Sequence, residues 1–359
     1  MAKLQSTEII GVANRPATIC SNTMCIWFDT VNLKPVISYC GYSPPWSVGG
    51  AMITARCGLA GAGTQDAGLV FGGFASFSPK SCTEEYDGAS WSAGGALSIA
   101  RLGLAGAGTQ NEGLAFGGYC NEGLSCTEEY NGTSWSAGGA LITARHFLAG
   151  AGTENAGLAF GGSYSGSCTE EYNGTAWSAG GALIEARSSL AGVGTQNAGL
   201  AMGGGGYSPI SCTEEYDGIS WSSGGALIEA RSSLAGVGTQ NAGLALGGGG
   251  YGPTSYTEEY NGTTWTTGGA LIEGRGSLAG AGSQNAGLAF GGAASYSPKS
   301  CTEEYNGTSW SSRGALLIAR CSLAGAGTQS VGLAFGGTPS GSCTEEYDGD
   351  ILIIRDIIL

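Results

Sequence analysis

Paired carboxylates are the most frequent feature of this sequence that could do chemistry. Seven copies of the tetrapeptide Thr-Glu-Glu-Tyr hold fourteen of its 28 acidic residues, and acid–base catalysis or a calcium site would use two neighbouring carboxylates. Adjacent side chains of a strand point to opposite faces, however, so Glu128 and Glu129 do not converge on one point. We therefore expect one glutamate of each pair to bind a repeated arginine or backbone donors, and the other to face solvent.

Cysteine and histidine offer little for a metal site. The chain has twelve cysteines but one histidine, His146, and it contains no Cys-x-x-Cys pair, which removes most zinc schemes. Equivalent positions in successive repeats are usually too far apart for disulfides, so we expect reduced thiols that pack as small buried residues. We expect no metal and no cofactor. Six cysteines directly precede a Thr-Glu-Glu-Tyr copy, namely Cys82, Cys126, Cys168, Cys212, Cys301 and Cys343.

The segments that carry these residues recur with one period. Within 42 to 45 residues the chain shows four short strand-like runs, separated by turns that contain glycine and often Asn-Gly or Asp-Gly. Four antiparallel strands in a repeat of this length are typical of a β-propeller blade. We therefore predict an all-β protein, a propeller of seven four-stranded blades, with small residues where the innermost strands crowd the axis. The tryptophans that mark the period are Trp46, Trp91, Trp135, Trp177, Trp221, Trp265 and Trp310.

The two ends of the repeat region complement each other. After its last Thr-Glu-Glu-Tyr copy the chain lacks the tryptophan strand that follows every other copy, whereas residues 46–56 form such a strand with no blade before them. We predict that residues 46–56 complete the seventh blade beside residues 343–347 and close the ring. The propeller then spans residues 46–349, between a segment with its own strand pair, 1–45, and an apolar tail, 350–359.

The loops between the second and third strands are the first candidate site. They differ among copies in length, and each of six carries an aromatic residue. Alternating strand directions place these loops on one face, and exposed aromatics on a rigid scaffold are typical of binding surfaces. Drift in unconstrained loops would give the same variation. The candidate binding residues are Phe77, Tyr119, Tyr164, Tyr207, Tyr251 and Tyr296.

The opposite face carries a second candidate, which is more uniform. A glutamine recurs in the turn after six of the seven innermost strands, and a ring of such turns would surround one mouth of the central channel. The ring could hold a sugar or an ion, although turn preference alone also explains it. These glutamines are Gln65, Gln110, Gln196, Gln240, Gln284 and Gln329.

One pattern resembles a known family. A diglycine ends an apolar strand, a tyrosine follows, a tryptophan stands five residues later, and an arginine precedes the next inner strand, as in Gly117, Gly118, Tyr130, Trp135 and Arg145. This pattern resembles the kelch motif over residues 46–349, which implies a kelch-like propeller. The uniform copies also resemble the glycine-rich repeats of predicted phage and other viral virion proteins, and residues 26–39 resemble a hairpin of fibre-type proteins. Kelch-fold copper oxidases need paired histidines, which one histidine cannot supply.

Charge and hydropathy restrict the partners. The net charge is −14 and the pI is near 4.4, so nucleic acids and anionic membranes would repel the chain. No apolar run approaches the roughly 20 residues of a membrane span, and the N-terminal residues contain no apolar run of signal-peptide length. We expect no nucleic-acid partner, no membrane insertion, and assembly in a host cytoplasm without a signal peptide.

The resemblance and the missing catalytic constellations favour a non-enzymatic virion protein. It would be displayed on a fibre, tail or capsid and bind a host-surface receptor, a glycan or other virion proteins, as a monomer or a homo-oligomer within a larger assembly. Residues 1–45, with the tail, would attach it to the particle. Two alternatives stay open: a kelch-type protein that acts on or binds carbohydrate, and a cytosolic kelch adaptor. A pocket with convergent polar groups at the channel mouth would favour the carbohydrate protein, and a partner domain would favour the adaptor.

Overall fold

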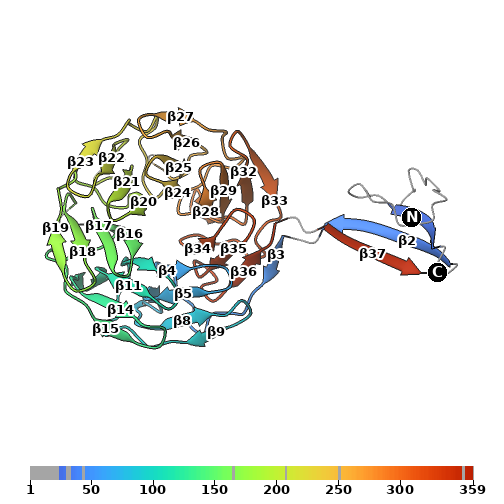
Figure 1. The fold of residues 1–359 in the computed structure, drawn as a ribbon, viewed down its shortest axis with the longest axis horizontal. Coiled ribbons are helices and arrows are strands. Elements are labelled where there is room, and N and C mark those ends of the chain that lie inside the picture. Colours follow the sequence, from blue (N-terminus) through green and yellow to red (C-terminus); the bar gives the residue numbers. More distant parts are fainter. Residues whose placement is uncertain are drawn as a thin grey trace. The chain divides into compact units, whose positions relative to one another are not determined.

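The larger part of the molecule is a ring of seven antiparallel sheets. The computed structural model describes residues 24–29, 34–42, 45–163, 166–206, 208–249, 252–349 and 352–358. It divides into two compact units, residues 46–347 and residues 1–45 together with 348–359. In the larger unit seven four-stranded sheets surround a central axis, and the described residues form no helix (Figure 1). The predicted all-β, seven-bladed propeller is therefore confirmed.

The blades are numbered along the chain, and their strands run from the axis outwards. Blade 1 contains β4 (Ala60–Gly63), β5 (Gly68–Phe71), β8 (Thr83–Tyr86) and β9 (Trp91–Ala93). Blade 2 contains β10 (Ala105–Gly108), β11 (Gly113–Phe116), β14 (Thr127–Tyr130) and β15 (Trp135–Ala137). Blade 3 contains β16 (Ala149–Thr153), β17 (Ala156–Phe160), β18 (Thr169–Tyr172) and β19 (Trp177–Ala179). Blade 4 contains β20 (Ala191–Thr195), β21 (Ala198–Met202), β22 (Thr213–Tyr216) and β23 (Trp221–Ser223).

The remaining three blades repeat this order. Blade 5 contains β24 (Ala235–Thr239), β25 (Ala242–Leu246), β26 (Thr257–Tyr260) and β27 (Trp265–Thr267). Blade 6 contains β28 (Ala279–Ser283), β29 (Ala286–Phe290), β32 (Thr302–Tyr305) and β33 (Trp310–Arg313). Blade 7 contains β34 (Ala324–Gly327), β35 (Gly332–Phe335), β36 (Thr344–Tyr347) and β3 (Trp46–Val48). Small hairpins in three blades are formed by β6 (Phe74–Ala75) with β7 (Ser78–Pro79), β12 (Tyr119–Cys120) with β13 (Glu122–Gly123), and β30 (Ala293–Ala294) with β31 (Ser297–Pro298).

The ring closes as the sequence predicts. Strand β3, from the N-terminal end of the propeller, is the outermost strand of blade 7 and pairs antiparallel with β36. In this register Trp46 faces Tyr347 and Val48 faces Glu345. The two ends of the propeller are therefore joined in one sheet.

Apolar side chains of neighbouring blades form the core. The last four residues of each second strand are buried, and in blade 2 the Phe116 ring lies 5.1 Å from the Trp177 ring of blade 3. Gly150, in the innermost strand of blade 3, leaves room for this phenylalanine, because a Cβ there would lie 2.7 Å from the Phe116 ring. Glycine is thus needed by close approach to the preceding blade, which refines the expectation of crowding at the axis.

A second glycine of the innermost strand is required by the backbone. Gly152 has a φ of 96°, in the left-handed region that residues other than glycine rarely adopt. A Cβ at this residue would lie 2.0 Å from the carbonyl oxygen of Ala156. In the Ala-Gly-x-Gly pattern, the first glycine is therefore needed for the close contact with the preceding blade, and the second is needed for the turn.

The smaller unit contains a three-stranded sheet. Strands β1 (Met24–Asp29) and β2 (Lys34–Tyr42) form an antiparallel hairpin, as expected from the sequence, and β37 (Leu352–Ile358) pairs along the other edge of β2. The apolar C-terminal tail thus supplies an edge strand of this sheet. Among the described residues, no helix has the length and apolar character needed to cross a membrane.

Candidate functional site

The first glutamate of each pair joins the segment between two blades to the blade that follows. Glu128 accepts a hydrogen bond from Arg101 (2.9 Å) and another from the backbone amide of Ser98 (2.7 Å). Both side chains are buried, and burial lowers the pKa of Arg101 while the Glu128 carboxylate opposes this shift. The expected pairing of one glutamate with the repeated arginine is confirmed. The seven ion pairs are Arg56–Glu84, Arg101–Glu128, Arg145–Glu170, Arg187–Glu214, Arg231–Glu258, Arg275–Glu303 and Arg320–Glu345.

The second glutamate does not simply face solvent, and that part of the expectation is wrong. Its half-buried carboxylate accepts a hydrogen bond from the tyrosine hydroxyl of the next blade, as Glu129 does from Tyr172. Burial and then this bond raise the pKa of Tyr172 well above its ordinary value. Six junctions contain this bond, namely Tyr86–Glu346, Tyr130–Glu85, Tyr172–Glu129, Tyr216–Glu171, Tyr305–Glu259 and Tyr347–Glu304.

The threonine of the tetrapeptide has the same kind of role. Its hydroxyl accepts a hydrogen bond from the indole nitrogen of the next blade, as Thr127 does from Trp177 at 2.8 Å. Every residue of Thr-Glu-Glu-Tyr is therefore used in contacts between blades or with the segment between them, and both carboxylates of the pair accept hydrogen bonds from the protein itself.

The repeated glutamines also connect blades. The side-chain nitrogen of Gln240 donates to the backbone oxygens of Gly199 (3.2 Å) and Tyr216 (2.6 Å) in the preceding blade. The predicted polar ring at a channel mouth is corrected in this respect, because its amide nitrogens are occupied by the protein itself. The same bonds are made by Gln65, Gln110, Gln196, Gln284 and Gln329.

Blade 3 has a glutamate, Glu154, where the other blades have this glutamine. A carboxylate cannot donate to the carbonyls of the preceding blade. Burial, and then the charges of Glu129 and Glu112, raise the pKa of Glu154 above its ordinary value. The junction between blades 2 and 3 is therefore built differently on this side.

The cysteines are unpaired but less buried than expected. The side chains of nine are described, all of them in the propeller, and all nine are free and half-buried. The predicted absence of disulfides holds for these nine, whereas their predicted burial is wrong. The thiol of Cys301 donates to the Glu273 carboxylate at 2.9 Å, so this side chain also serves a local contact.

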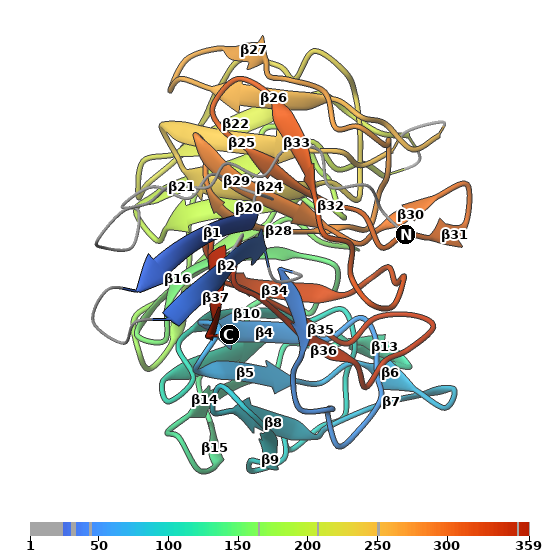
Figure 2. The same ribbon diagram turned by 90° about the vertical axis from the view of Figure 1, so that its right-hand side faces the viewer.

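We call the side of the propeller with the connections after the second and fourth strands the loop face, and the other side the turn face. Figure 2 shows the hairpins β6–β7 and β30–β31 protruding from the same side of the ring. Their tips have left-handed backbone at Ser76 and Phe77, and at Ser295 and Tyr296. The tight turns hold Phe77 and Tyr296 fully exposed.

The other predicted loop aromatics differ from these two. Tyr119 is half-buried, and its ring lies 5.0 Å from that of His146, which lies 4.9 Å from that of Phe147. This residue therefore packs against its own blade junction. The three remaining candidates, Tyr164, Tyr207 and Tyr251, lie outside the described residues.

A ring of backbone hydrogen bonds lies at the centre of the loop face. The residue two positions before each innermost strand bonds to its equivalent in the preceding blade, as Ser277 does when its amide donates to Ser233 at 3.0 Å. Six such bonds link consecutive blades. The non-glycine members have φ values of 51° to 53°, a strained conformation that often marks functional sites. The ring residues are Gly58, Gly103, Phe147, Ser189, Ser233, Ser277 and Ser322.

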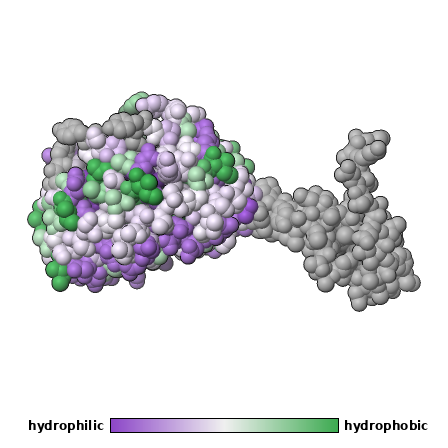
Figure 3. Space-filling model, turned by 90° about the horizontal axis from the view of Figure 1, so that it is seen from above, coloured by the Kyte–Doolittle hydropathy of each residue, from purple (hydrophilic) through white to green (hydrophobic). Residues whose placement is uncertain are grey.

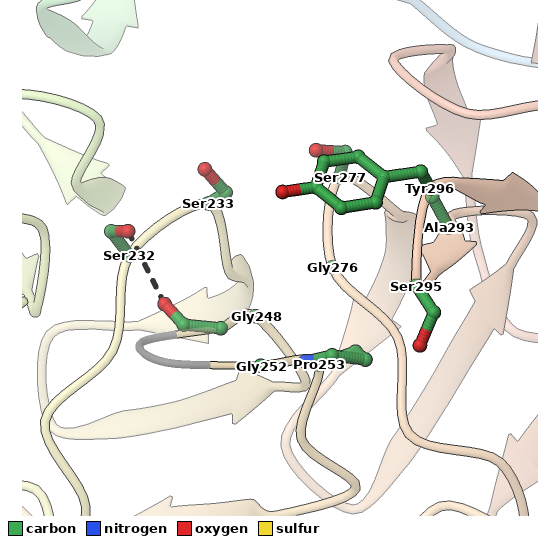
Figure 4. Close-up of a pocket in the computed structure, with 11 residues that line it drawn as sticks. Ser232, Ser233, Gly248, Gly252, Pro253, Gly276, Ser277, Ala293, Ser295 and Tyr296 are labelled. Atoms are coloured by element: carbon green, nitrogen blue, oxygen red, sulfur yellow. Dashed lines mark hydrogen bonds between the residues drawn. The ribbon is translucent and has the colours of Figure 1, made fainter.

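A cavity of about 390 Å³ opens on this ring between blades 5 and 6, and we call it the blade 5–6 slot. Its floor contains Ser233 and Ser277, its walls come from the loops of both blades, and Tyr296 extends over it (Figure 4). The Ser232 hydroxyl donates to the Gly249 carbonyl at 3.3 Å. The sequence analysis predicted Tyr296 but not the serines. The two residues that follow each repeated arginine vary among the copies, and this variation could have indicated them.

The described lining of the slot contains no carboxylate, imidazole, thiol or amine side chain. Its lining is serine, glycine, proline, alanine and tyrosine. Across the part of the chain that the structure describes, no three His, Cys, Asp or Glu side chains are grouped to hold a metal ion. The arrangement suits recognition of an uncharged group.

The apolar residues that the structure describes on the outer wall are scattered. Exposed aliphatic residues stand near each repeated arginine, and Figure 3 shows apolar residues in separate patches between hydrophilic ones. Single exposed apolar residues are normal on protein surfaces. The exposed aliphatic residues that stand three positions before a repeated arginine are Ile53, Ile142, Ile184, Ile228, Ile272 and Leu317.

Comparison with known proteins gives the fold alone. No protein-family model matches the chain, and no curated protein matches it. Among solved structures, the chain is similar to that of a protein named YjhT, with a TM-score of 0.59 and 13% sequence identity. The similarity covers 74% of this chain and 100% of that one, and at this identity it supports the propeller architecture.

Proposed function

We propose that this chain is a non-enzymatic attachment protein with a kelch-like propeller, which binds an outside surface through its loop face as part of a virus-like particle. One observation carries the binding role. The repeated polar side chains, such as Arg101, Glu128 and Gln240, are consumed by contacts within the ring, whereas Phe77 and Tyr296 are fully exposed on one face. Exposed aromatic residues on loops that a rigid scaffold holds in place are typical of binding surfaces.

The place in a particle rests on the style of the repeats. Seven uniform glycine-rich copies resemble those of viral virion proteins, and the propeller is a separate unit from residues 1–45 with 348–359. In this proposal the smaller unit attaches the protein to the particle, and the propeller meets a host-surface receptor or glycan. The partners are other virion proteins and this receptor.

A binding assay on bacterial cells tests the proposal. The fluorescently labelled protein is incubated with a panel of strains and its retention is measured by flow cytometry. We expect retention on at least one strain, and a loss of at least tenfold for the double variant Phe77→Ser, Tyr296→Ser. Ile219→Ser is the matched control, because Ile219 is also exposed and apolar but lies in a turn between third and fourth strands.

Three results would contradict the proposal. Equal retention of the double variant and the wild type would remove the loop face as the binding surface, and retention on no strain would count against an attachment role. A change in the mass of cell-surface glycans after incubation, measured by mass spectrometry, would point to an enzyme instead.

A further inference from the structure

We propose that the blade 5–6 slot binds one uncharged sugar ring. This inference rests on the proposed binding function of the loop face and names the class of ligand. Three observations support it: the size and charge of the slot, a junction elsewhere in the chain that fills the same place with its own side chains, and the chemistry of the lining.

The slot has the size and charge for a small neutral ligand. Its volume of about 390 Å³ lies near the lower end of the roughly 300–1,000 Å³ of small-molecule sites. No residue of its lining that the structure describes carries a charge. The chain as a whole has a net charge of −14, so an anionic ligand would be repelled over long distance. A neutral group of one or two rings remains.

The junction between blades 2 and 3 shows what fits in this place. The positions of Gly249, Gly276 and Ser277 in the slot correspond to those of Tyr119, His146 and Phe147 in the repeat. There the three rings are in contact, and a Cβ on Gly103 would lie 2.8 Å from the Phe147 ring. Gly103 corresponds to Ser233 of the slot. The chain therefore fills one junction with flat rings, whereas the described residues at the same positions of blades 5 and 6 are small and line an open slot.

The lining favours a hydroxylated ring over an aromatic one. Figure 4 shows the Ser233 hydroxyl, the Ser277 hydroxyl and the Tyr296 phenol around the open space. A purely apolar ring would leave these polar groups without partners, which is unfavourable. A sugar ring has hydroxyls for the three groups and an apolar C–H face for the exposed Tyr296 ring. Single sugars make few contacts, so we expect a dissociation constant on the order of 1 mM.

The test is a titration of the full chain by saturation-transfer NMR. The probes are glucose, galactose, mannose and N-acetylglucosamine, with glucuronate as the charged sugar and N-acetyltyrosinamide as the aromatic probe. We expect at least one neutral sugar to bind and both comparison probes to bind at least tenfold more weakly. Tyr296→Ser should weaken the sugar about tenfold, because it removes the stacking ring.

Ser233→Gly combined with Ser277→Phe is the sharper variant, because it copies the filled junction, where Gly103 leaves room for the Phe147 ring. Ser277 has a φ of 51° and Phe147 has one of 53°, so the backbone already accommodates phenylalanine at this place in another blade. We expect the variant to keep the wild-type unfolding midpoint and to lose sugar binding. Ile219→Ser on the turn face should bind as the wild type does.

The outcomes separate this inference from the proposed function. The slot assignment is overturned if no neutral sugar binds at 50 mM, if N-acetyltyrosinamide binds more tightly than every sugar, or if the variant with Ser233→Gly and Ser277→Phe binds unchanged. Cell retention that still depends on Phe77 and Tyr296 would then leave the attachment role intact. Conversely, sugar binding in the slot without retention on any cell would support the slot and contradict attachment.

Discussion

The walls where neighbouring blades meet and the loop face are both built from the same repeats. The residues at the walls hardly change from copy to copy, whereas those on the loop face do. At the walls, the tryptophan–threonine bond recurs in six junctions with donor–acceptor distances of 2.7 to 2.9 Å. On the loop face, the pair after the repeated arginine is His146 and Phe147 in one blade but Gly276 and Ser277 in another. The difference teaches that the stability of the ring resides in contacts that each copy repeats, so the loops can change without risk to the fold.

The largest effect is expected where the ring closes. Deleting residues 1–48 removes β3, including the buried Trp46, whose indole nitrogen donates to Thr302 at 2.8 Å. Loss of this side chain alone should lower the free energy of unfolding by about 3–5 kcal/mol, measured by guanidinium unfolding followed by circular dichroism. Deleting residues 1–44 keeps β3 and is the control. Equal midpoints for the two deletions would show that the closing strand is dispensable.

The buried ion pair comes next. Arg101→Ala leaves the buried Glu128 carboxylate without its cation, and we expect a loss of about 3–5 kcal/mol in the free energy of unfolding. Arg313→Ala is the matched control, because Arg313 pairs with Glu304 at 2.7 Å but is about a third exposed. The control should cost about 0–1 kcal/mol. Chemical unfolding of both variants measures the difference, and losses of similar size would refute the structural role of the repeated arginine.

The turn face has its own odd position, Glu154, where an amide should be better than a carboxylate. Glu154→Gln restores a donor for the carbonyls of blade 2 and should stabilise the protein by about 0.5–1.5 kcal/mol at pH 7. Folding raises the pKa of Glu154, so the folded state binds this proton more tightly than the unfolded state. The destabilisation by charged Glu154 is therefore present at neutral pH and disappears as the pH falls below the ordinary value of about 4.3.

Thermal unfolding at pH 7 and pH 4 measures this dependence. The gain in melting temperature from Glu154→Gln should be larger at pH 7 than at pH 4. Gln240→Glu is the reciprocal variant and should destabilise blade 5 at pH 7. An equal gain at both pH values would mean that the charge of Glu154 has no part in the effect.

The period of the sequence predicted the fold, because spacing and turn residues are local information. Strand count along the chain also predicted the closing strand, since Trp46 had no blade before it and Tyr347 had no strand after it. The partner of each second glutamate was not predicted. Tyr172 and Glu129 are 43 residues apart, about one period, and a periodic sequence cannot show whether a residue contacts its own copy or the next one.

The candidate site was predicted only at its tips. The exposure of Phe77 and Tyr296 could be predicted, because each lies in a variable loop whose sequence places an aromatic residue among turn-forming residues. The blade 5–6 slot depends on small residues from two blades and on the side chains that are missing there, such as the equivalent of Phe147. Missing side-chain volume at one junction cannot be recognised from the sequence of one blade, because the junction is formed only when two blades pack together.

The smallest effect on stability is expected at the tip of the loop face, within six residues of a position where the effect is large. Phe71 is fully buried and its ring lies 4.9 Å from that of Trp135, whereas Phe77 is fully exposed. Phe71→Ala should therefore cost about 3–5 kcal/mol, and Phe77→Ala should change the free energy of unfolding by no more than about 0.5 kcal/mol. Both variants remove the same atoms, so any difference in guanidinium midpoints comes from their surroundings. A loss above about 1 kcal/mol for Phe77→Ala would mean that the loop supports the ring, and the separation between a fixed wall and a variable face would not hold.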